Sequence, residues 1–154
     1  MTLRAGVRIG VDVGRARVGV ARSDVEGLLV IPVVTVKRGA GDLAELARLA
    51  REHDALEFVV GLPLSLTGAQ TSSTEDARGF AGRLAAASGL AVRLVDERLS
   101  TVAAQRSLQS TGKDIRSSRP VIDQVAATII LQNALETERS SGKPPGELII
   151  QDEG

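Results

Sequence analysis

The feature that most constrains the fold is a pair of alternating segments near the N-terminus, residues 7–14 and 17–21, joined by a short turn. In the first segment valine or isoleucine stands at every second position, so these side chains share one face of a strand. The opposite face carries Asp12, with Gly10 and Gly14 on either side. Two strands with so short a connection pair antiparallel. The chain therefore opens with a sheet that has one apolar face and one face holding a carboxylate.

Asp12 is costly to bury as an ion unless a cation or several donors compensate it. On its side of the sheet the next strand offers Arg17, Gly19 and Ala21, so few bulky side chains surround it. The pattern indicates that something large approaches Asp12 closely, such as a metal-bridged phosphate backbone. The alternative is a structural acid that is satisfied by Arg15, Arg17 or backbone N–H groups.

The remaining elements predict a mixed sheet flanked by helices. A third strand at 28–37 contains Pro32, which indicates an edge position or a bulge. Apolar periodicity, turn residues and capping signals define the elements that follow. They are a helix at 42–53 with Asp42 as N-cap, a buried strand at 58–62, a helix from a capping-box-like 73–76 to Ser88, a strand at 91–95, and helices at 101–110 and 120–139.

This β-β-β-α-β-α-β-α-α order is that of a ribonuclease H-like fold, an α/β fold with a mixed five-stranded sheet flanked by helices. We expect one domain over residues 1–139 and a loosely ordered acidic tail over 140–154, in which 148–150 are apolar enough for a short pairing. A chain of 154 residues that is 43% hydrophobic and 25% charged fits a single core.

Composition excludes several classes of function. The chain has no cysteine, which excludes disulfides and thiolate metal sites, and its one histidine, His53, fits a helix end better than a ligand set. Two phenylalanines without tryptophan or tyrosine cannot form a base-stacking platform. No leader-like segment and no run of 18 apolar residues is present in the sequence, so we expect a cytoplasmic protein with no membrane partner.

Charge is balanced overall but unevenly distributed. Residues 1–22 hold five arginines against Asp12 alone, and residues 93–119 hold six cations against three acids. Such local positive charge favours a polyanionic partner, although scattered solvated arginines would give the same count.

Three further acids stand where sheet folds gather functional groups. Asp96 and Glu97 follow a strand end, and Asp123 is predicted in the first turn of the last helix. Taken alone, Asp96 and Glu97 would be ordinary turn residues, and Asp123 would be explained by its favourable interaction with the positive end of the helix dipole. Together with Asp12 they form an oxygen-only ligand set that suits Mg²⁺ or Mn²⁺. Two such ions about 4 Å apart can activate water and stabilise a leaving oxygen in phosphodiester hydrolysis.

Four motifs in register carry a resemblance to a known family over roughly residues 6–135. They are GVDVG at 10–14 with RVGVA at 17–21, VGLPL at 60–64, DERLST at 96–101, and DQVAA at 123–127 followed by ILQ at 130–132. With them the chain resembles the YqgF/RuvX family. That family is similar to Holliday-junction resolvases of the RuvC type, has a ribonuclease H-like fold and is described as a pre-16S rRNA nuclease in ribosome maturation.

The resemblance implies a metal site of Asp12, Glu97 and Asp123, holding Mg²⁺ or Mn²⁺, with two ions once substrate is bound. Ribonuclease H-like proteins usually place an acid at the end of the fourth strand, where this chain has Gly61 and Pro63. The second ligand is therefore open between Glu97 and Asp96.

The same resemblance implies contacts to the substrate. Ser65 and Thr101 would supply hydrogen bonds. The glycine, serine, lysine and arginine content of residues 112–119, next to Asp123, separately favours a mobile flap there. The implied phosphate contacts are Arg15, Arg17, Lys113, Arg116 and Arg119.

The leading hypothesis is a metal-dependent endonuclease acting on structured nucleic acid, with precursor 16S rRNA as substrate and ribosomal particles as partners. A Holliday-junction resolvase acting on branched DNA, a nucleotide binder of the actin-like ATPase type and a non-catalytic RNA-binding scaffold are the alternatives. The sequence does not decide whether the substrate is RNA or DNA. It also does not decide between a monomer and a homodimer, because a symmetric double cut implies a two-fold dimer whereas a single rRNA cut does not.

Overall fold

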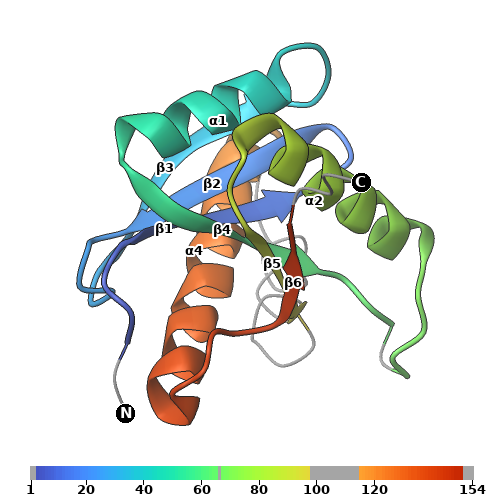
Figure 1. Cartoon of the computed structure of the whole chain (residues 1–154). Helices are drawn as coiled ribbons and strands as arrows, with labels where there is room; N and C mark the ends of the chain where they lie inside the picture. The colour runs from blue at the N-terminus through green and yellow to red at the C-terminus, as the bar shows by residue number, and fades with distance from the viewer. Residues whose placement is uncertain (1–2, 66, 98–114, 151–154) are drawn as a thin grey trace.

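The computed structural model describes residues 3–65, 67–97 and 115–150; the side chains of 115–121 lie outside that description. A single sheet separates two helical layers, with α1 and α2 on one face and α4 on the other (Figure 1). The elements are β1 Val7–Val13, β2 Arg17–Ser23, β3 Val30–Lys37, α1 Asp42–Glu52, β4 Ala55–Leu62, α2 Ser72–Ser88, β5 Val92–Asp96, α4 Ile115–Ser141 and β6 Glu147–Ile149.

The strand order is β3-β2-β1-β4-β5-β6. Strands β1, β2 and β3 form the predicted antiparallel meander, whereas β4 pairs parallel with both β1 and β5. This is the mixed sheet of a ribonuclease H-like fold, with one strand more than the five predicted. The additional strand, β6, comes from the C-terminal tail and pairs antiparallel with β5.

Strand β3 is an edge strand, and its ladder with β2 shifts register between Val20 and Ala21, which face Val34 and Pro32. Both readings of Pro32 are therefore confirmed. An edge position and a bulge each accommodate a residue that cannot donate a ladder hydrogen bond.

Alternation along the strands builds two apolar layers. Ile9, Val11, Val18 and Val20 face α1 and α2 and belong to the larger core cluster, as the period-2 pattern predicts. On the other face a smaller cluster of Val59 and residues of α4 holds that helix against the sheet. None of the described helices combines the length and the apolarity needed to cross a bilayer.

Helix starts were predicted less well than helix interiors. Helix α1 has Gly41, in the left-handed region at φ 88°, as its N-cap, so Asp42 is its first residue and the N-cap prediction was wrong. The capping box of α2 is formed by Thr71 and Thr74, so it begins two residues before the predicted 73–76. The side chain of Thr74 is also hydrogen-bonded to the carbonyl of Pro63, which ties the helix to the end of β4.

Helix α4 begins at Ile115, five residues before the predicted start at Pro120. Asp123 therefore lies beyond the first turn, where a helix dipole has little effect. The dipole explanation of this acid is wrong. The helix predicted at 101–110 lies outside the described residues.

Candidate active site

Helix α4 approaches the glycine-bearing face of the sheet so closely that side chains there would collide with it. A Cβ on Gly10 would stand 2.8 Å from the carbonyl oxygen of Ala127 and 2.8 Å from Cβ of Leu131, and one on Gly19 would overlap the main chain of Asp123. The large object that the bare glycine face admits is therefore this helix. The space over Gly10 and Gly19 is therefore filled by α4 and is not where a phosphate backbone would lie.

The same close approach brings Asp123 next to Asp12. Asp12 faces Gly19 across the β1–β2 ladder, and the Cβ of Asp123 lies 2.9 Å from the point where a Cβ of Gly19 would be. Facing residues of antiparallel strands have Cβ atoms about 4.5–5.5 Å apart, so the two acids are neighbours. Because Gly19 has no side chain, Asp123 of α4 can occupy the space above it.

A second glycine, Gly61, leaves space for the Glu97 side chain on the other side of Asp12. The parallel register pairs Val11 with Val60, and one further step along both strands puts Gly61 beside Asp12. The Oε1 atom of Glu97 lies 2.6 Å from the Cβ position of Gly61. The three acids therefore form a row on the α4 face: Asp123, Asp12, Glu97.

Strand parity separates Glu97 from Asp96. In β5, Leu94 belongs to the core under α1 and α2, whereas Val95 packs against the cluster under α4. Because side chains alternate along a strand, Asp96 is expected on the same face as Leu94, away from α4. Glu97 is then expected on the face that holds Asp12. Of the two candidate acids, Glu97 is the one that the fold brings into the row.

The middle acid of the row is the most buried, and Asp123 at one end is the most exposed. Asp12 is 3% exposed and Glu97 8% exposed, whereas the Asp123 side chain is 18% exposed. Arg17 Nε donates a hydrogen bond to Asp123 Oδ2 at 3.0 Å, and the Arg17 side chain is 32% exposed. Ion pairs of such exposure stabilise a fold by about 0–1 kcal/mol. The Asp123 end of the row is thus both open to solvent and weakly held.

The donors fit a hard cation in chemistry, because all three are carboxylates and carboxylate oxygens are what Mg²⁺ and Mn²⁺ prefer. They do not yet converge: within residues 3–65, 67–97 and 115–150 no group of three or more histidine, cysteine, aspartate or glutamate side chains is arranged to hold a metal ion. One of the three is engaged by Arg17. His53 is the C-cap residue of α1, on the opposite side of the sheet from α4.

The other predicted contacts are only partly placed. Arg15 is exposed in the turn between β1 and β2. Ser65 accepts a hydrogen bond from the Ala69 N–H and thereby closes its own loop. Residues 115–119 begin α4, so the prediction that they form an irregular connection was wrong, and their movement as a flap stays a prediction. Lys113, Thr101 and residue 112 lie outside the described residues, as do the side chains of Arg116 and Arg119.

A groove that sequence reasoning missed runs beside the Arg17–Asp123 pair. It has a volume of about 360 Å³ and is lined by Ala16, Arg17, Thr35 and Lys37. The amide of Gln124 donates a hydrogen bond of 3.0 Å to Thr35 Oγ1, which fixes α4 to β3 at this place. Arg17 and Lys37 face each other in the β2–β3 ladder, and no local sequence motif predicts that the two residues are neighbours.

A second hollow, of about 380 Å³, adjoins the other end of the row. Glu97 lines it together with Leu62, Ile130, Asn133 and Pro145. Its walls come from β4, β5, α4 and the segment before β6, so the C-terminal tail contributes to the surroundings of the site.

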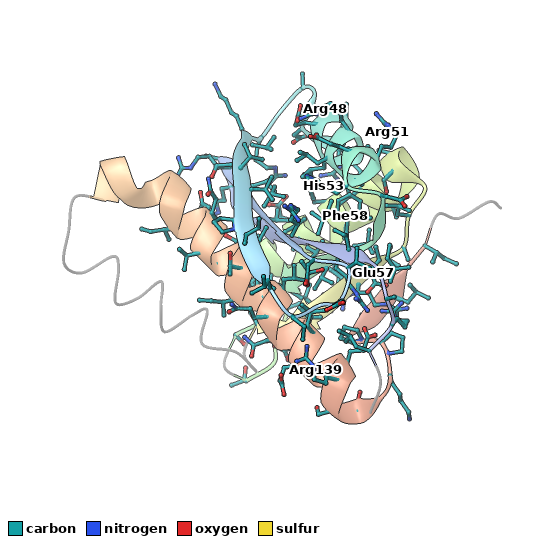
Figure 2. The ribbon with its side chains drawn as sticks, turned by 90° about the vertical axis from the view of Figure 1, so that its left-hand side faces the viewer. Arg48, Arg51, His53, Glu57, Phe58 and Arg139 are labelled. Carbon is teal, nitrogen blue, oxygen red and sulfur yellow. The ribbon has the colours of Figure 1, made fainter. Side chains whose placement is uncertain are left out.

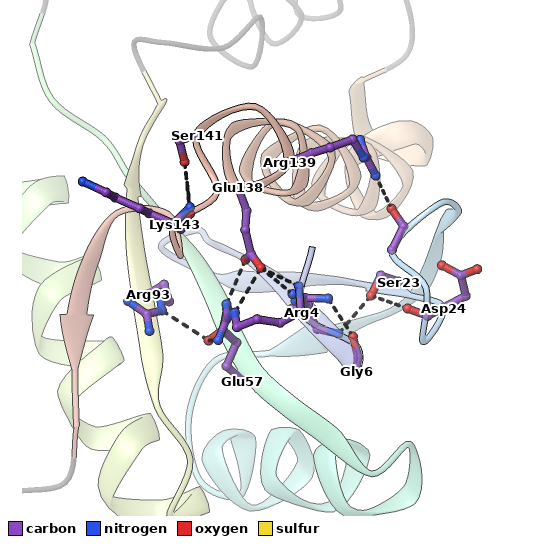
Figure 3. A network of polar contacts seen from close by, with 12 residues as sticks. Arg4, Gly6, Ser23, Asp24, Glu57, Arg93, Glu138, Arg139, Ser141 and Lys143 are labelled. Atoms are coloured by element: carbon purple, nitrogen blue, oxygen red, sulfur yellow. Dashed lines mark hydrogen bonds and ion pairs between the residues drawn. The ribbon is translucent and has the colours of Figure 1, made fainter. Parts of the chain in front are cut away.

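A buried charge network fixes the far end of α4 (Figure 3). Glu138 accepts hydrogen bonds from Arg4 and Arg8, and Glu57 accepts them from Arg4 and Arg93. Burial opposes ionisation of Glu138, but the bonds from Arg4 and the charge of Arg8 outweigh it and lower the pKa of Glu138 below its ordinary value. Burial lowers the pKa of Arg8. Polar contacts therefore hold α4 at both ends, with apolar packing between them.

Figure 2 shows α4 crossing one face of the sheet while α1, marked by Arg48 and Arg51, covers the other. The helix runs antiparallel to β1, because Asp123 lies near Asp12 and Glu138 near Arg8. The network at Glu138 thus sets where Asp123 stands along the sheet.

Comparison with known proteins agrees with this architecture. A family model described as "RuvX: Holliday junction resolvase" matches residues 6–137. A protein of Clavibacter sepedonicus is 57% identical over 150 residues, covering 96% of this chain and 93% of its own, and one of Thermobifida fusca (strain YX) is 51% identical over 156 residues, covering 96% and 98%. Both carry the name "Putative pre-16S rRNA nuclease".

Among solved structures, Thermus thermophilus RuvC in complex with a Holliday junction substrate aligns over 90% of this chain and 99% of its own, with a TM-score of 0.56 and 17% identity. At that identity the likeness concerns the fold alone. The family match extends over most of the chain and takes in all three acids of the row. This chain therefore belongs to the RuvX family.

Proposed function

We propose that this protein is a metal-dependent endonuclease that hydrolyses phosphodiester bonds in structured nucleic acid, with precursor 16S rRNA as its substrate in the cytoplasm. The observation that carries the proposal is the row of Asp123, Asp12 and Glu97, in which two glycines seat the outer acids beside the central one. The names of the relatives support the rRNA substrate.

Asp12, Glu97 and Asp123 would hold Mg²⁺ or Mn²⁺, with two ions once substrate is bound and with Asp96 as the alternate to Glu97. When bound, the ions supply an activated water and stabilisation of the leaving oxygen. The chain contributes a buried, fixed Asp12 and an open Asp123 end at which a phosphate can enter. Low exposure around Asp12 and Glu97 strengthens electrostatic interactions there.

Contacts to the phosphate backbone would come from the cations around the open end of the row. Arg17 borders Asp123 directly, and Arg15 is exposed in the adjoining turn. Lys113, Arg116 and Arg119 precede Asp123 in sequence and complete the set. Contacts of this kind position the substrate without reading its sequence.

Cleavage of Holliday junctions is the second candidate, favoured by the description of the family model. The two candidates differ in symmetry: a paired cut in a four-way junction needs a two-fold dimer, whereas one cut in precursor rRNA is compatible with a monomer acting on ribosomal particles.

A cleavage assay on the purified protein tests the proposal. Precursor 16S rRNA and a four-way DNA junction are each incubated with Mg²⁺, Mn²⁺ or EDTA. We expect cleavage of the rRNA with either ion and none in EDTA. Cleavage of the junction alone would favour the resolvase. RNA binding that is independent of metal, without cleavage of any substrate, would instead indicate a scaffold.

A further inference from the structure

The ion pair between Arg17 and Asp123 occupies an acid that the proposed function requires. It is made through Nε of Arg17 at 3.0 Å, and both side chains remain partly exposed. A carboxylate held this way is neutralised in the free protein, but it is not locked, because solvent reaches both partners. Arg17 therefore competes with any cation for the same oxygen.

The groove next to this pair offers Arg17 another anion. Its four lining residues include both Arg17 and Lys37, which face each other across the β2–β3 ladder. Lys37 is exposed. The volume of about 360 Å³ lies within the range of about 300–1,000 Å³ that small ligands occupy. Two cations on one wall make this groove suited to a phosphate group of a nucleic-acid backbone.

We propose that Arg17 is an exchangeable arginine, which neutralises Asp123 in the free protein and moves to a substrate phosphate in the groove, where Lys37 is its companion. This inference rests on the proposed function, since it assumes that Asp123 serves a cation during catalysis. A divalent cation at Asp123 repels the guanidinium, and the groove phosphate attracts it. Arrival of the cation and capture of the backbone are thereby coupled through one side chain.

The exchange predicts that removing Arg17 has opposite effects on two ligands. Arg17→Gln should bind Mn²⁺ alone about two- to fivefold more tightly, the factor that loss of an exposed ion pair allows. The same variant should bind a fluorescent RNA duplex in EDTA more weakly, with a salt dependence reduced by about one phosphate contact. A merely structural arginine would weaken both ligands together.

Lys37→Gln is the matched control, because Lys37 lines the groove and forms no part of the row of acids. It should weaken RNA binding and leave the Mn²⁺ affinity unchanged. Arg17→Lys retains a cation and should keep most of the RNA affinity. Thermal unfolding of each variant confirms that it is folded.

Calorimetric titration with Mn²⁺ and fluorescence anisotropy with the duplex give the two affinities. If the wild type binds Mn²⁺ and cleaves RNA but Arg17→Gln binds Mn²⁺ no more tightly, the exchange is refuted and the proposed function stands. If the wild type neither binds Mn²⁺ nor cleaves, the proposed function and the exchange fail together. Tighter Mn²⁺ binding together with weaker RNA binding supports the exchange.

Discussion

Asp123 lies directly over Gly19, with its Cβ 2.9 Å from the point where a side chain of Gly19 would begin. Because Gly19 faces Asp12 in the adjacent strand, this contact sets one acid beside the other. Because Gly19 has no side chain, α4, which lies far from β2 in sequence, can bring Asp123 next to Asp12.

Gly19→Ala should both destabilise the protein and impair cleavage. The new methyl group would overlap the main chain of Asp123, so α4 must shift away from β2. Overpacking of this kind costs about 1–3 kcal/mol. Chemical unfolding measures the loss of stability, and single-turnover cleavage of precursor rRNA measures the displaced acid.

Gly82→Ala is the control for that experiment. Gly82 is exposed on α2, and a Cβ there meets nothing within 4 Å. Alanine in a helix interior is favoured over glycine by about 0.5–1 kcal/mol, so this variant should be more stable and cleave normally. Wild-type stability and activity in Gly19→Ala would contradict the seating of Asp123 on a glycine.

Asp123→Asn should separate function from stability. The acid lies beyond the first turn of α4 and pairs with one half-exposed arginine, so its removal should change the free energy of unfolding by less than about 1 kcal/mol. Loss of a metal ligand removes several kcal/mol of transition-state stabilisation. That corresponds to a fall in the cleavage rate of a hundredfold or more. A stable protein with an unchanged rate would show that Asp123 has no catalytic part.

Glu97→Gln and Asp96→Asn should differ in their effect on cleavage. Of these two acids, Glu97 is the one whose side chain lies against Gly61, in the row with Asp12. We expect the Glu97 variant to lose cleavage and metal affinity, and the Asp96 variant to retain most of both. Titration with Mn²⁺ and rates at saturating metal provide the comparison. The reverse ranking would make Asp96 the second acid and refute the assignment by strand parity.

Glu138→Gln should remove a pH-dependent part of the stability. Because the pKa of Glu138 is lowered in the folded protein, its contribution is complete above its ordinary value of about 4.5. The contribution is lost as the pH falls through the lowered pKa, since the unfolded chain then takes up the proton first. The difference in unfolding free energy between wild type and variant should therefore be largest near neutral pH and shrink toward pH 3.

At neutral pH that difference should reach about 3–5 kcal/mol, as expected when one partner of a buried ion pair is removed. Glu136→Gln is the control on the same helix, because the Glu136 side chain is 71% exposed and pairs only locally with Arg139. Denaturant unfolding at a series of pH values supplies both curves. A difference that does not vary with pH would contradict the role of this network.

Much of the fold followed from local pattern. The alternation of apolar residues in β1 and β2 correctly predicted the two faces of the sheet, and Pro32 correctly predicted an edge strand with a bulge. Helix ends were less predictable, since the Thr71 cap and the start at Ile115 depend on local geometry that several neighbouring polar residues could supply.

The site shows the same division between local and long-range information. The carboxylates stood out because acids are rare in apolar strands, but the reason for the glycines around Asp12 did not, because the helix that fills their space is more than a hundred residues away in sequence. The groove with Lys37 and the network at Glu138 depend on contacts of the same range.

The single-turnover cleavage rate of Asp12→Asn on precursor rRNA in saturating Mn²⁺ shows whether Asp12 is the middle ligand of a catalytic metal site. RNA affinity in EDTA is measured on the same samples. We expect cleavage reduced a hundredfold or more, with RNA affinity within about twofold of the wild type. A folded variant that cleaves at the wild-type rate would contradict this role of Asp12.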